Sequence, residues 1–68
     1  CDAAAERYGL SPRERDVFDL LVRGRSIEYI AQSLTISFNT AKSHIRHIYV
    51  KADVHSRQEL QELLDREE

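Results

Sequence analysis

Hydrophobic residues recur at helical spacing along most of the 68-residue chain. An α-helix places residues three and four positions apart on one face, so this spacing predicts helices that each bury one face. The predicted helices cover residues 12–23, 27–34, 38–52 and 57–66. No stretch shows the alternation of hydrophobic and polar residues that a strand would need. The sequence therefore predicts an all-α domain of four helices.

A serine precedes each predicted helix and marks its start. At this position the serine side chain can accept a hydrogen bond from a free backbone N–H of the first turn. Ser11 is followed by Pro12 and Glu14, which suit a first turn and complete a capping box. Ser56 and Glu59 predict a second capping box at the last helix. The other two helices begin after Ser26 and Ser37.

Only three residues, 35–37, separate the second and third predicted helices. A connection this short forces two helices to cross sharply, which is the helix-turn-helix arrangement. Ala31 fits this corner because a small side chain lets the helices approach closely. Gly24 supplies the left-handed residue that commonly ends a helix. Thr35 stands where such turns often have glycine, so a positive φ there would strain this β-branched residue.

The predicted helix over residues 38–52 has two faces of different chemistry. Its apolar side chains fall on one arc, which we expect to pack on the core. That arc holds Phe38, Ala41, Ile45, Ile48, Tyr49 and Ala52. The opposite face holds Asn39, Thr40, Ser43, His44, Arg46, His47 and Lys51, with Lys42 at its flank and Val50 as its one apolar residue. These residue types are typical of a helix that packs on a core and contacts DNA.

The distribution of charge supports this interpretation, although the net charge of −2 by itself argues against a nucleic-acid binder. Residues 37–57 hold four bases and one acid, whereas residues 58–68 hold one base and five acids. All three histidines also lie in the middle segment. The positive potential is thus concentrated on the two-faced helix, and local potential matters more for docking than net charge.

Length and composition exclude several classes of protein. A chain this short has one core, and no apolar run approaches the roughly 18 residues of a membrane span. No signal peptide is visible, and the single cysteine, Cys1, cannot form an internal disulfide. There is no glycine-rich phosphate loop, and no orienting acid is evident for Ser43 beside His44. We therefore expect a cytoplasmic domain without membrane contact, enzymatic activity or cofactor.

Four segments occur in the order LSPRERDVFDLLVRG, SIEYIAQSL, SFNTAKSHIRHIYVKADV and SRQEL. Together they resemble the LuxR-type helix-turn-helix domain of bacterial transcription regulators, from Leu10 to about Leu64. The resemblance implies a four-helix domain that binds double-stranded DNA sequence-specifically, with its third helix in the major groove. It also implies inverted-repeat operators, pairing through the last helix, and an N-terminal sensor or receiver domain outside this chain. RNA polymerase is a further partner that the resemblance admits.

The expected domain covers residues 10–68, after a linker or frayed helical turn over residues 1–9. In the last helix, leucines fall on one side and acids on the other. If the domain's own core uses these leucines, only a polar and acidic surface remains for a partner. We therefore predict a monomer or a weak homodimer.

Four outward residues are candidates for reading base edges. The resemblance assigns this role to Lys42, Ser43 and Arg46. An arginine can donate two parallel hydrogen bonds to guanine, whereas a serine can bond either a base or a phosphate. Asn39 can bond adenine, or it can simply be exposed to solvent. Without DNA, Arg46 would be a solvated surface arginine.

A second set of residues is predicted to contact phosphates, which adds affinity and salt dependence without sequence information. The resemblance places Thr40, His44 and the start of the last helix near phosphates. For Ser37 a structural cap is the competing role, for Arg57 a surface charge, and for the histidines a place at the rim of the core. The full set is Ser37, Thr40, His44, His47, Lys51, Ser56 and Arg57.

His44 and His47 lie three residues apart, which is close enough on a helix to suggest a metal site. A tetrahedral site needs further ligands, and no cysteine or carboxylate in the same helix is suitably placed to supply them. The sequence therefore predicts no metal.

The chain departs from the family's pattern in its core. Ala41 stands where valine is usual, and Ala52 with Asp53 where leucine and glycine are common. Smaller side chains predict looser packing unless Phe38 or Tyr49 fills the space.

Two other functions use the same sequence features. The acidic last helix and the negative net charge suit a protein-interaction module that keeps the fold without binding DNA. A promoter-recognition domain of a sigma-type factor uses the same turn and helix.

Overall fold

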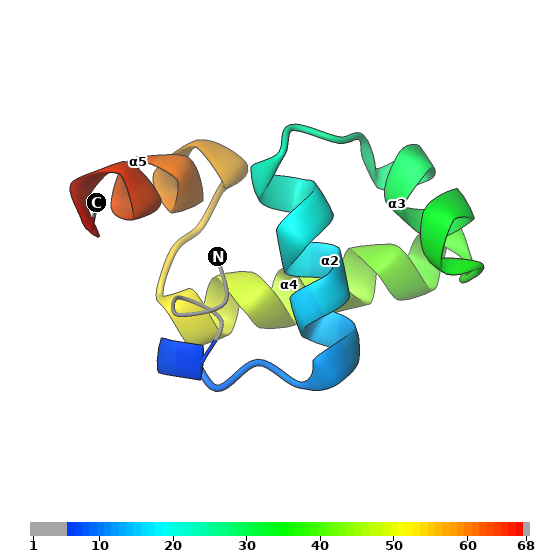
Figure 1. The fold of residues 1–68 in the computed structure, drawn as a ribbon, viewed down its shortest axis with the longest axis horizontal. Helices are drawn as coiled ribbons and strands as arrows, with labels where there is room; N and C mark the ends of the chain where they lie inside the picture. Colours follow the sequence, from blue (N-terminus) through cyan, green and yellow to red (C-terminus); the bar gives the residue numbers. More distant parts are fainter. Residues whose placement is uncertain (1–5, 68) are drawn as a thin grey trace.

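The computed structural model describes residues 6–67 as an assembly of helices joined by short loops (Figure 1). After a helical turn at residues 6–7 come α2 (Pro12–Val22), α3 (Ile27–Leu34), α4 (Phe38–Ala52) and α5 (Arg57–Glu67). The described residues contain no strand. Each predicted helix is present and each end agrees within one residue, which confirms the all-α fold. None of the helices in residues 6–67 is long and apolar enough to cross a membrane.

Local hydrogen bonds start the first three of these helices as predicted. The capping box of α2 is complete, because Glu14 N–H donates to Ser11 Oγ at 3.3 Å and Ser11 N–H donates to Glu14 Oε1 at 3.0 Å. Ser26 Oγ accepts from a backbone N–H at 3.1 Å in α3, and Ser37 Oγ accepts at 3.0 Å in α4. These bonds satisfy N–H groups that would otherwise lack a partner within the helix.

The capping box predicted for α5 is only half formed. Glu59 N–H donates to Ser56 Oγ at 3.2 Å, as expected. The Glu59 carboxylate, however, lies 3.5 Å from Nδ1 of His55 and accepts no hydrogen bond from the Ser56 backbone. His55 thus competes for the carboxylate that the sequence assigned to the cap.

Three helices end in the same way, with one residue in the left-handed region. These residues are Gly24 (φ 84°), Thr35 (φ 56°) and Asp53 (φ 57°). The residue after each donates its N–H to the carbonyl five positions earlier, at 3.2, 3.0 and 2.9 Å respectively, which is the bond of a Schellman motif. Thr35 thus has the positive φ that, from the sequence, was expected to strain a β-branched residue.

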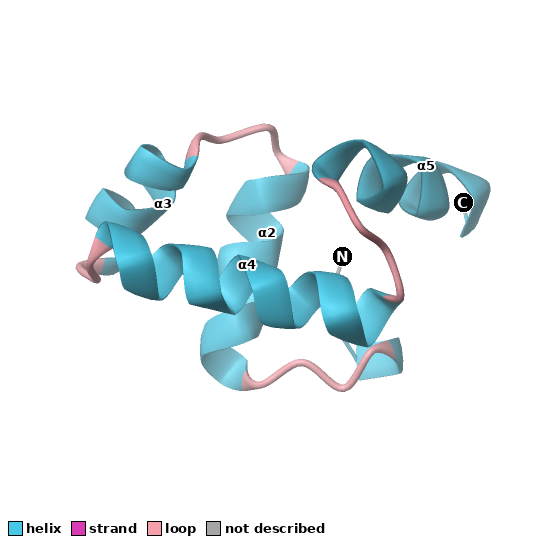
Figure 2. Ribbon diagram, turned by 180° about the vertical axis from the view of Figure 1, so that it is seen from behind, coloured by secondary structure: helices cyan, strands magenta, loops and turns pink. Residues whose placement is uncertain are grey.

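The core lies where α4 crosses α2 and α3 (Figure 2). Four residues of the predicted apolar arc are buried and Tyr49 is half-buried: the buried ones are Ala41, Ile45, Ile48 and Ala52. Val17, Phe18 and Leu21 of α2 and Ile30 of α3 complete the buried centre. The small corner residue Ala31 is also buried, as predicted.

Phe38 does not belong to this core, which corrects the prediction for the first residue of the arc. Its side chain is 45% exposed. Phe38 is the first residue of α4 and directly follows the turn, so it lines an open hollow beside Ala31 and Thr35. It therefore cannot replace the volume that Ala41 lacks.

Helix α5 lies at one end of the molecule, beside the last turn of α2 (Figure 1). Leu60 is fully buried, and Leu63 and Leu64 pack half-buried against the core. The leucines of α5 thus pack within the domain, which is the condition on which the prediction of a monomer or weak homodimer rests.

The segment before α2 also contacts the domain. Tyr8 is half-buried against the core, and the carbonyl of Gly9 accepts a hydrogen bond from Nζ of Lys51 at 3.3 Å. These contacts extend two residues to the N-terminal side of Leu10, where the domain was expected to begin. The first five residues of the predicted linker lie outside the described part of the chain.

Candidate nucleic-acid interface

The outward face of α4 presents polar side chains that have no partner in the domain. Asn39, Ser43 and Arg46 are all exposed, and they make no side-chain hydrogen bond or ion pair with any described residue. Helix α4 contains no acidic residue. Three of the four candidates for base reading are therefore accessible, and their donors and acceptors are free.

Lys42, the fourth candidate, lies at the flank of this face. It is exposed, and its Nζ stands 5.7 Å from the centre of the Phe38 ring, within the range of a cation–π interaction. The ammonium thus lies beside an exposed ring, because Phe38 itself is outside the core.

The first turn of α4 uses its hydroxyl groups internally. Ser37 Oγ accepts from Thr40 N–H and also donates to Thr40 Oγ1 at 2.8 Å. Ser37 is therefore a helix cap, the role that competed with phosphate contact in the sequence. The hydroxyl of Thr40 is exposed and keeps its own hydrogen to donate.

Lys51, which the sequence predicts to contact phosphate, is bonded within the domain. Its Nζ lies 2.6 Å from Oε1 of Glu14 and also donates to the Gly9 carbonyl. Glu14 is the only buried charged residue of the described chain. Burial alone would raise the pKa of Glu14, but the Lys51 ammonium and the hydrogen bonds from Lys51 and Ser11 outweigh burial and lower it. Lys51 thus connects α4 to α2.

Arg57 is also engaged inside the domain. Its guanidinium donates to the carbonyl of Leu21 at 2.7 Å and to the carbonyl of Arg25. These bonds hold the start of α5 against the end of α2 and satisfy a carbonyl of its last turn. Burial raises the pKa of the nearby Tyr49, and the Arg57 charge opposes that shift in part. The sequence predicts Arg57 as a phosphate contact or a surface charge. In the structure its hydrogen bonds connect the start of α5 to the end of α2.

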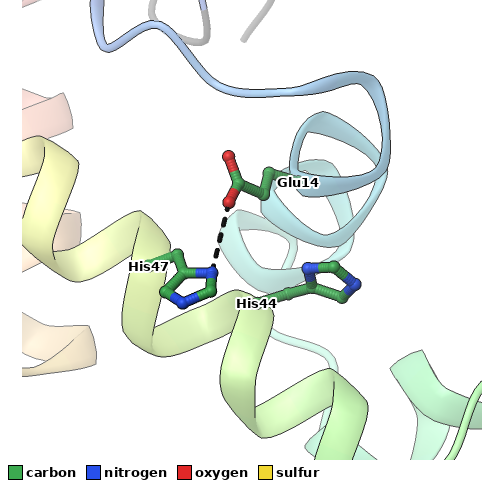
Figure 3. Close-up of side chains that lie close together, drawn as sticks. All are labelled: Glu14, His44 and His47. Atoms are coloured by element: carbon green, nitrogen blue, oxygen red, sulfur yellow. Dashed lines mark ion pairs between the residues drawn. The ribbon is translucent and has the colours of Figure 1, made fainter.

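The histidines of α4 lie on the flank that faces α2 (Figure 3). His47 is exposed, and its Nδ1 lies 3.5 Å from Oε2 of Glu14. His44 is half-buried, and its Nδ1 is buried without a hydrogen-bond partner among the described residues. One nitrogen of each ring and one Glu14 oxygen all lie within 4.8 Å of one another. The carboxylate that α4 lacks is thus supplied by α2.

Sequence reasoning missed Glu14 as the centre of this arrangement. The only signal in the sequence was the capping box, which accounts for the hydrogen bond from Ser11 N–H to one of the two carboxylate oxygens. Lys51 lies 37 positions away in the sequence, and no local pattern connects the two residues. Ser56, also predicted to contact phosphate, caps the first turn of α5 and remains exposed.

The residues of this fold match a known family of regulators. The family of bacterial regulatory proteins of the luxR type matches residues 8–64. The monoamine regulon transcriptional regulator of Klebsiella aerogenes is 39% identical over 51 residues, which are 75% of this chain and 22% of that protein. A putative HTH-type transcriptional regulator of Aeromonas salmonicida is 45% identical over 51 residues, 75% of this chain and 26% of that protein.

The nitrate/nitrite response regulator protein NarL of Escherichia coli K12 is 40% identical over 50 residues, 74% of this chain and 23% of that protein. The chain thus spans about a quarter of the length of these curated relatives. No solved structure gives a significant match. The family match covers most of the chain and includes the turn between α3 and α4, so the chain belongs to the LuxR family of bacterial regulatory proteins and carries its helix-turn-helix domain.

Proposed function

We propose that this domain binds double-stranded DNA sequence-specifically, with α4 in the major groove. The observation that carries the proposal is the outward face of α4, where Asn39, Ser43 and Arg46 are exposed and unpartnered on a helix without acids. The major groove is wide enough for an α-helix, and each base pair presents a distinct pattern of donors and acceptors there. Helix α4 is held in place by its buried face, so the free polar side chains on its outward face can bond to this pattern.

The candidate residues differ in what they can read. Arg46 can bind the O6 and N7 atoms of guanine with two hydrogen bonds, and Asn39 can bind adenine in the same two-point manner. A good pair of this kind contributes about 1–3 kcal/mol of discrimination against the wrong base. Ser43 is short and can bond either a base or a phosphate, so Arg46 should dominate sequence preference.

The internal bonds of Lys51 and Arg57 reduce the number of cations available for phosphates. Of the four bases in residues 37–57, only Lys42 and Arg46 have no hydrogen bond or ion pair to a described residue. Each neutralised phosphate contributes about −0.9 to the slope of log affinity against log salt. We expect a slope near −2 for each domain, whereas four free cations would give a slope near −4.

The relatives indicate the larger setting of the domain. Two of them are transcriptional regulators by name and NarL is a response regulator, and this chain spans about a quarter of their length. We infer that the domain is the output part of a cytoplasmic bacterial transcription regulator. A sensor or receiver domain elsewhere in the full protein would then control when α4 reaches DNA.

Selection from a pool of random duplexes, followed by affinity measurement on the recovered sequence, tests the proposal. Arg46→Ala and Lys42→Ala should weaken binding, and Arg46→Ala should also relax the preference for one base. Arg66→Ala is the matched control, because it removes one exposed arginine charge from α5 rather than from α4. Equal affinity of the wild type and both α4 variants would refute the assignment of the reading face.

The polar and acidic surface of α5 supports one alternative, a protein-interaction module without DNA binding. The exposed polar and acidic residues of this surface are Gln58, Glu59, Gln61, Glu62 and Asp65. A DNA-binding domain should bind duplexes at low salt and lose affinity steeply as salt rises. Absence of duplex binding at low salt would favour the interaction module.

A further inference from the structure

Three side chains with metal-ligating atoms converge from two helices on the α2 flank of α4. Glu14 comes from the first turn of α2, and His44 and His47 come from consecutive turns of α4 (Figure 3). One oxygen of Glu14 and one nitrogen of each imidazole ring lie within 4.8 Å of one another. The cluster joins residues 30 or more positions apart, so it depends on the tertiary fold.

The two oxygens of Glu14 have different surroundings. Oε1 accepts hydrogen bonds from Ser11 N–H at 3.0 Å and from Lys51 Nζ at 2.6 Å. Oε2 accepts no hydrogen bond from residues 6–67 and faces Nδ1 of His47 at 3.5 Å. The bonds to Oε1 fix the orientation of the carboxylate, and metal-ligating carboxylates are typically held by hydrogen bonds of this kind. Oε2 is left available as a ligand.

His44 provides a second and independent observation. Its Nδ1 is buried, yet no described residue donates to it or accepts from it. Buried polar atoms nearly always have a hydrogen-bond partner or a bound ion or water. An imidazole without a partner beside a carboxylate oxygen without a donor therefore indicates a ligand that interacts with both.

We propose that Glu14, His44 and His47 bind a divalent first-row transition metal ion, with Zn²⁺ as the ion that the donor set suits best. Two imidazole nitrogens and one carboxylate oxygen are a set that zinc uses in proteins, with the fourth position open to water. Zinc–nitrogen and zinc–oxygen bonds of about 2.0–2.2 Å place tetrahedral ligands about 3.4 Å apart. Oε2 of Glu14 and Nδ1 of His47, at 3.5 Å, already lie close to this spacing.

Metal binding would fix the reading helix to α2 at a third point, in addition to the core and the Lys51 bond. The Lys51 ammonium beside Oε1 opposes a second cation, so the affinity should be moderate and should rise when that charge is removed. The inference does not depend on DNA binding, because the three ligands belong to the free domain.

Calorimetric titration of the 68-residue chain with ZnCl₂ at pH 7.5 tests the proposal. A Cys1→Ser background removes a thiol that would bind zinc by itself. We expect one ion per chain. At ten times the dissociation constant, zinc should raise Tm by about 6–11 °C. Histidine side-chain NMR should show the resonances of His44 and His47 shifting, with those of His55 unchanged.

Single substitutions locate the ion. His44→Gln and His47→Gln should each weaken zinc binding by more than about tenfold. His55→Gln is the matched control, because it removes an exposed histidine that also lies beside a carboxylate, and it should bind zinc like the wild type. Lys51→Gln should strengthen binding, a gain that a merely destabilised variant would not show.

Two results would overturn the proposal. One is the absence of heat and of a Tm shift up to millimolar zinc. An ordered water would then be the hydrogen-bond partner of His44 Nδ1. The other is loss of binding in His55→Gln with no loss in His47→Gln, which would place the ion at the exposed pair of His55 and Glu59.

Discussion

Replacing Thr35 with glycine should stabilise the domain. Thr35 ends α3 with a φ of 56°, and its exposed side chain forms no hydrogen bond with the described residues. The left-handed conformation costs an L-residue about 1–2 kcal/mol, and the β-branch of threonine places it toward the upper value. Glycine avoids this cost but loses about 0.5–1 kcal/mol of additional chain entropy on folding. The net gain should be about 0.5–1.5 kcal/mol.

Denaturant unfolding of the 68-residue chain measures this gain as a free energy, and thermal unfolding measures it as a change in Tm. A domain of this size gains about 4–8 °C in Tm per kcal/mol, so Thr35→Gly should raise Tm by about 2–12 °C. Ser33→Gly is the matched control, because it places glycine at an exposed position inside α3 and should lower stability by about 0.5 kcal/mol. The two glycine substitutions should therefore change the free energy of unfolding in opposite directions.

Gly24 tests the same reasoning in the opposite direction. It has a φ of 84°, and a β-carbon added there would meet no heavy atom within 4 Å. Gly24→Ala should therefore lose about 0.5–1 kcal/mol from backbone conformation alone. If Thr35→Gly left stability unchanged or lowered it while Ser33→Gly behaved as expected, the left-handed residue would not be a source of strain.

Three further predictions follow from contacts in the core and between helices. Glu14→Gln should lower the free energy of unfolding at pH 7 by about 1.5–3 kcal/mol, because the amide loses the charged bond to Lys51. Folding lowers the pKa of Glu14 from about 4.5, so its contribution is complete above that pH and is lost as the pH falls through the folded value. Urea titrations from pH 5 to 3 should accordingly show a steeper loss in the wild type than in the variant. Phe38→Ala should cost less than about 1 kcal/mol in denaturant unfolding, whereas Phe18→Ala, in the core, should cost about 3–5 kcal/mol. Sedimentation should give a monomer at micromolar concentration, because the core already uses Leu60 and its neighbouring leucines; a tight dimer would contradict this.

The helix bounds were predictable because their signals are local. A serine cap and the N–H it binds are three residues apart, and the ends of α2 and α3 lie within a few residues of Gly24 and Thr35. Periodicity likewise identified the buried centre of α4. It failed at Phe38, because helical spacing gives the direction of a side chain and not the extent of the neighbouring helix that would cover it.

The partners of charged side chains were not predictable in the same way. Lys51 and Glu14 are 37 positions apart, and Arg57 and the carbonyl of Leu21 are 36 apart. Each lysine or arginine on an exposed helix fits a solvated surface or a phosphate contact equally well until the fold brings a partner near. The sequence therefore predicted which residues of α4 face outward, but it could not predict which of the basic side chains are bonded within the domain.

Glu14 shows how one residue of a local motif can organise a tertiary site. The capping box requires a side chain long enough to return to the backbone of Ser11, and this return places the carboxylate at the α2–α4 crossing. Burial there disfavours the charge, but the Lys51 ammonium and the hydrogen bonds from Lys51 and Ser11 outweigh burial and lower the pKa of Glu14. The second oxygen of the carboxylate lies 3.5 Å from Nδ1 of His47 on the flank of α4. Helix α4 is thus bonded to α2 through a carboxylate that, in the sequence, indicates only the start of a helix.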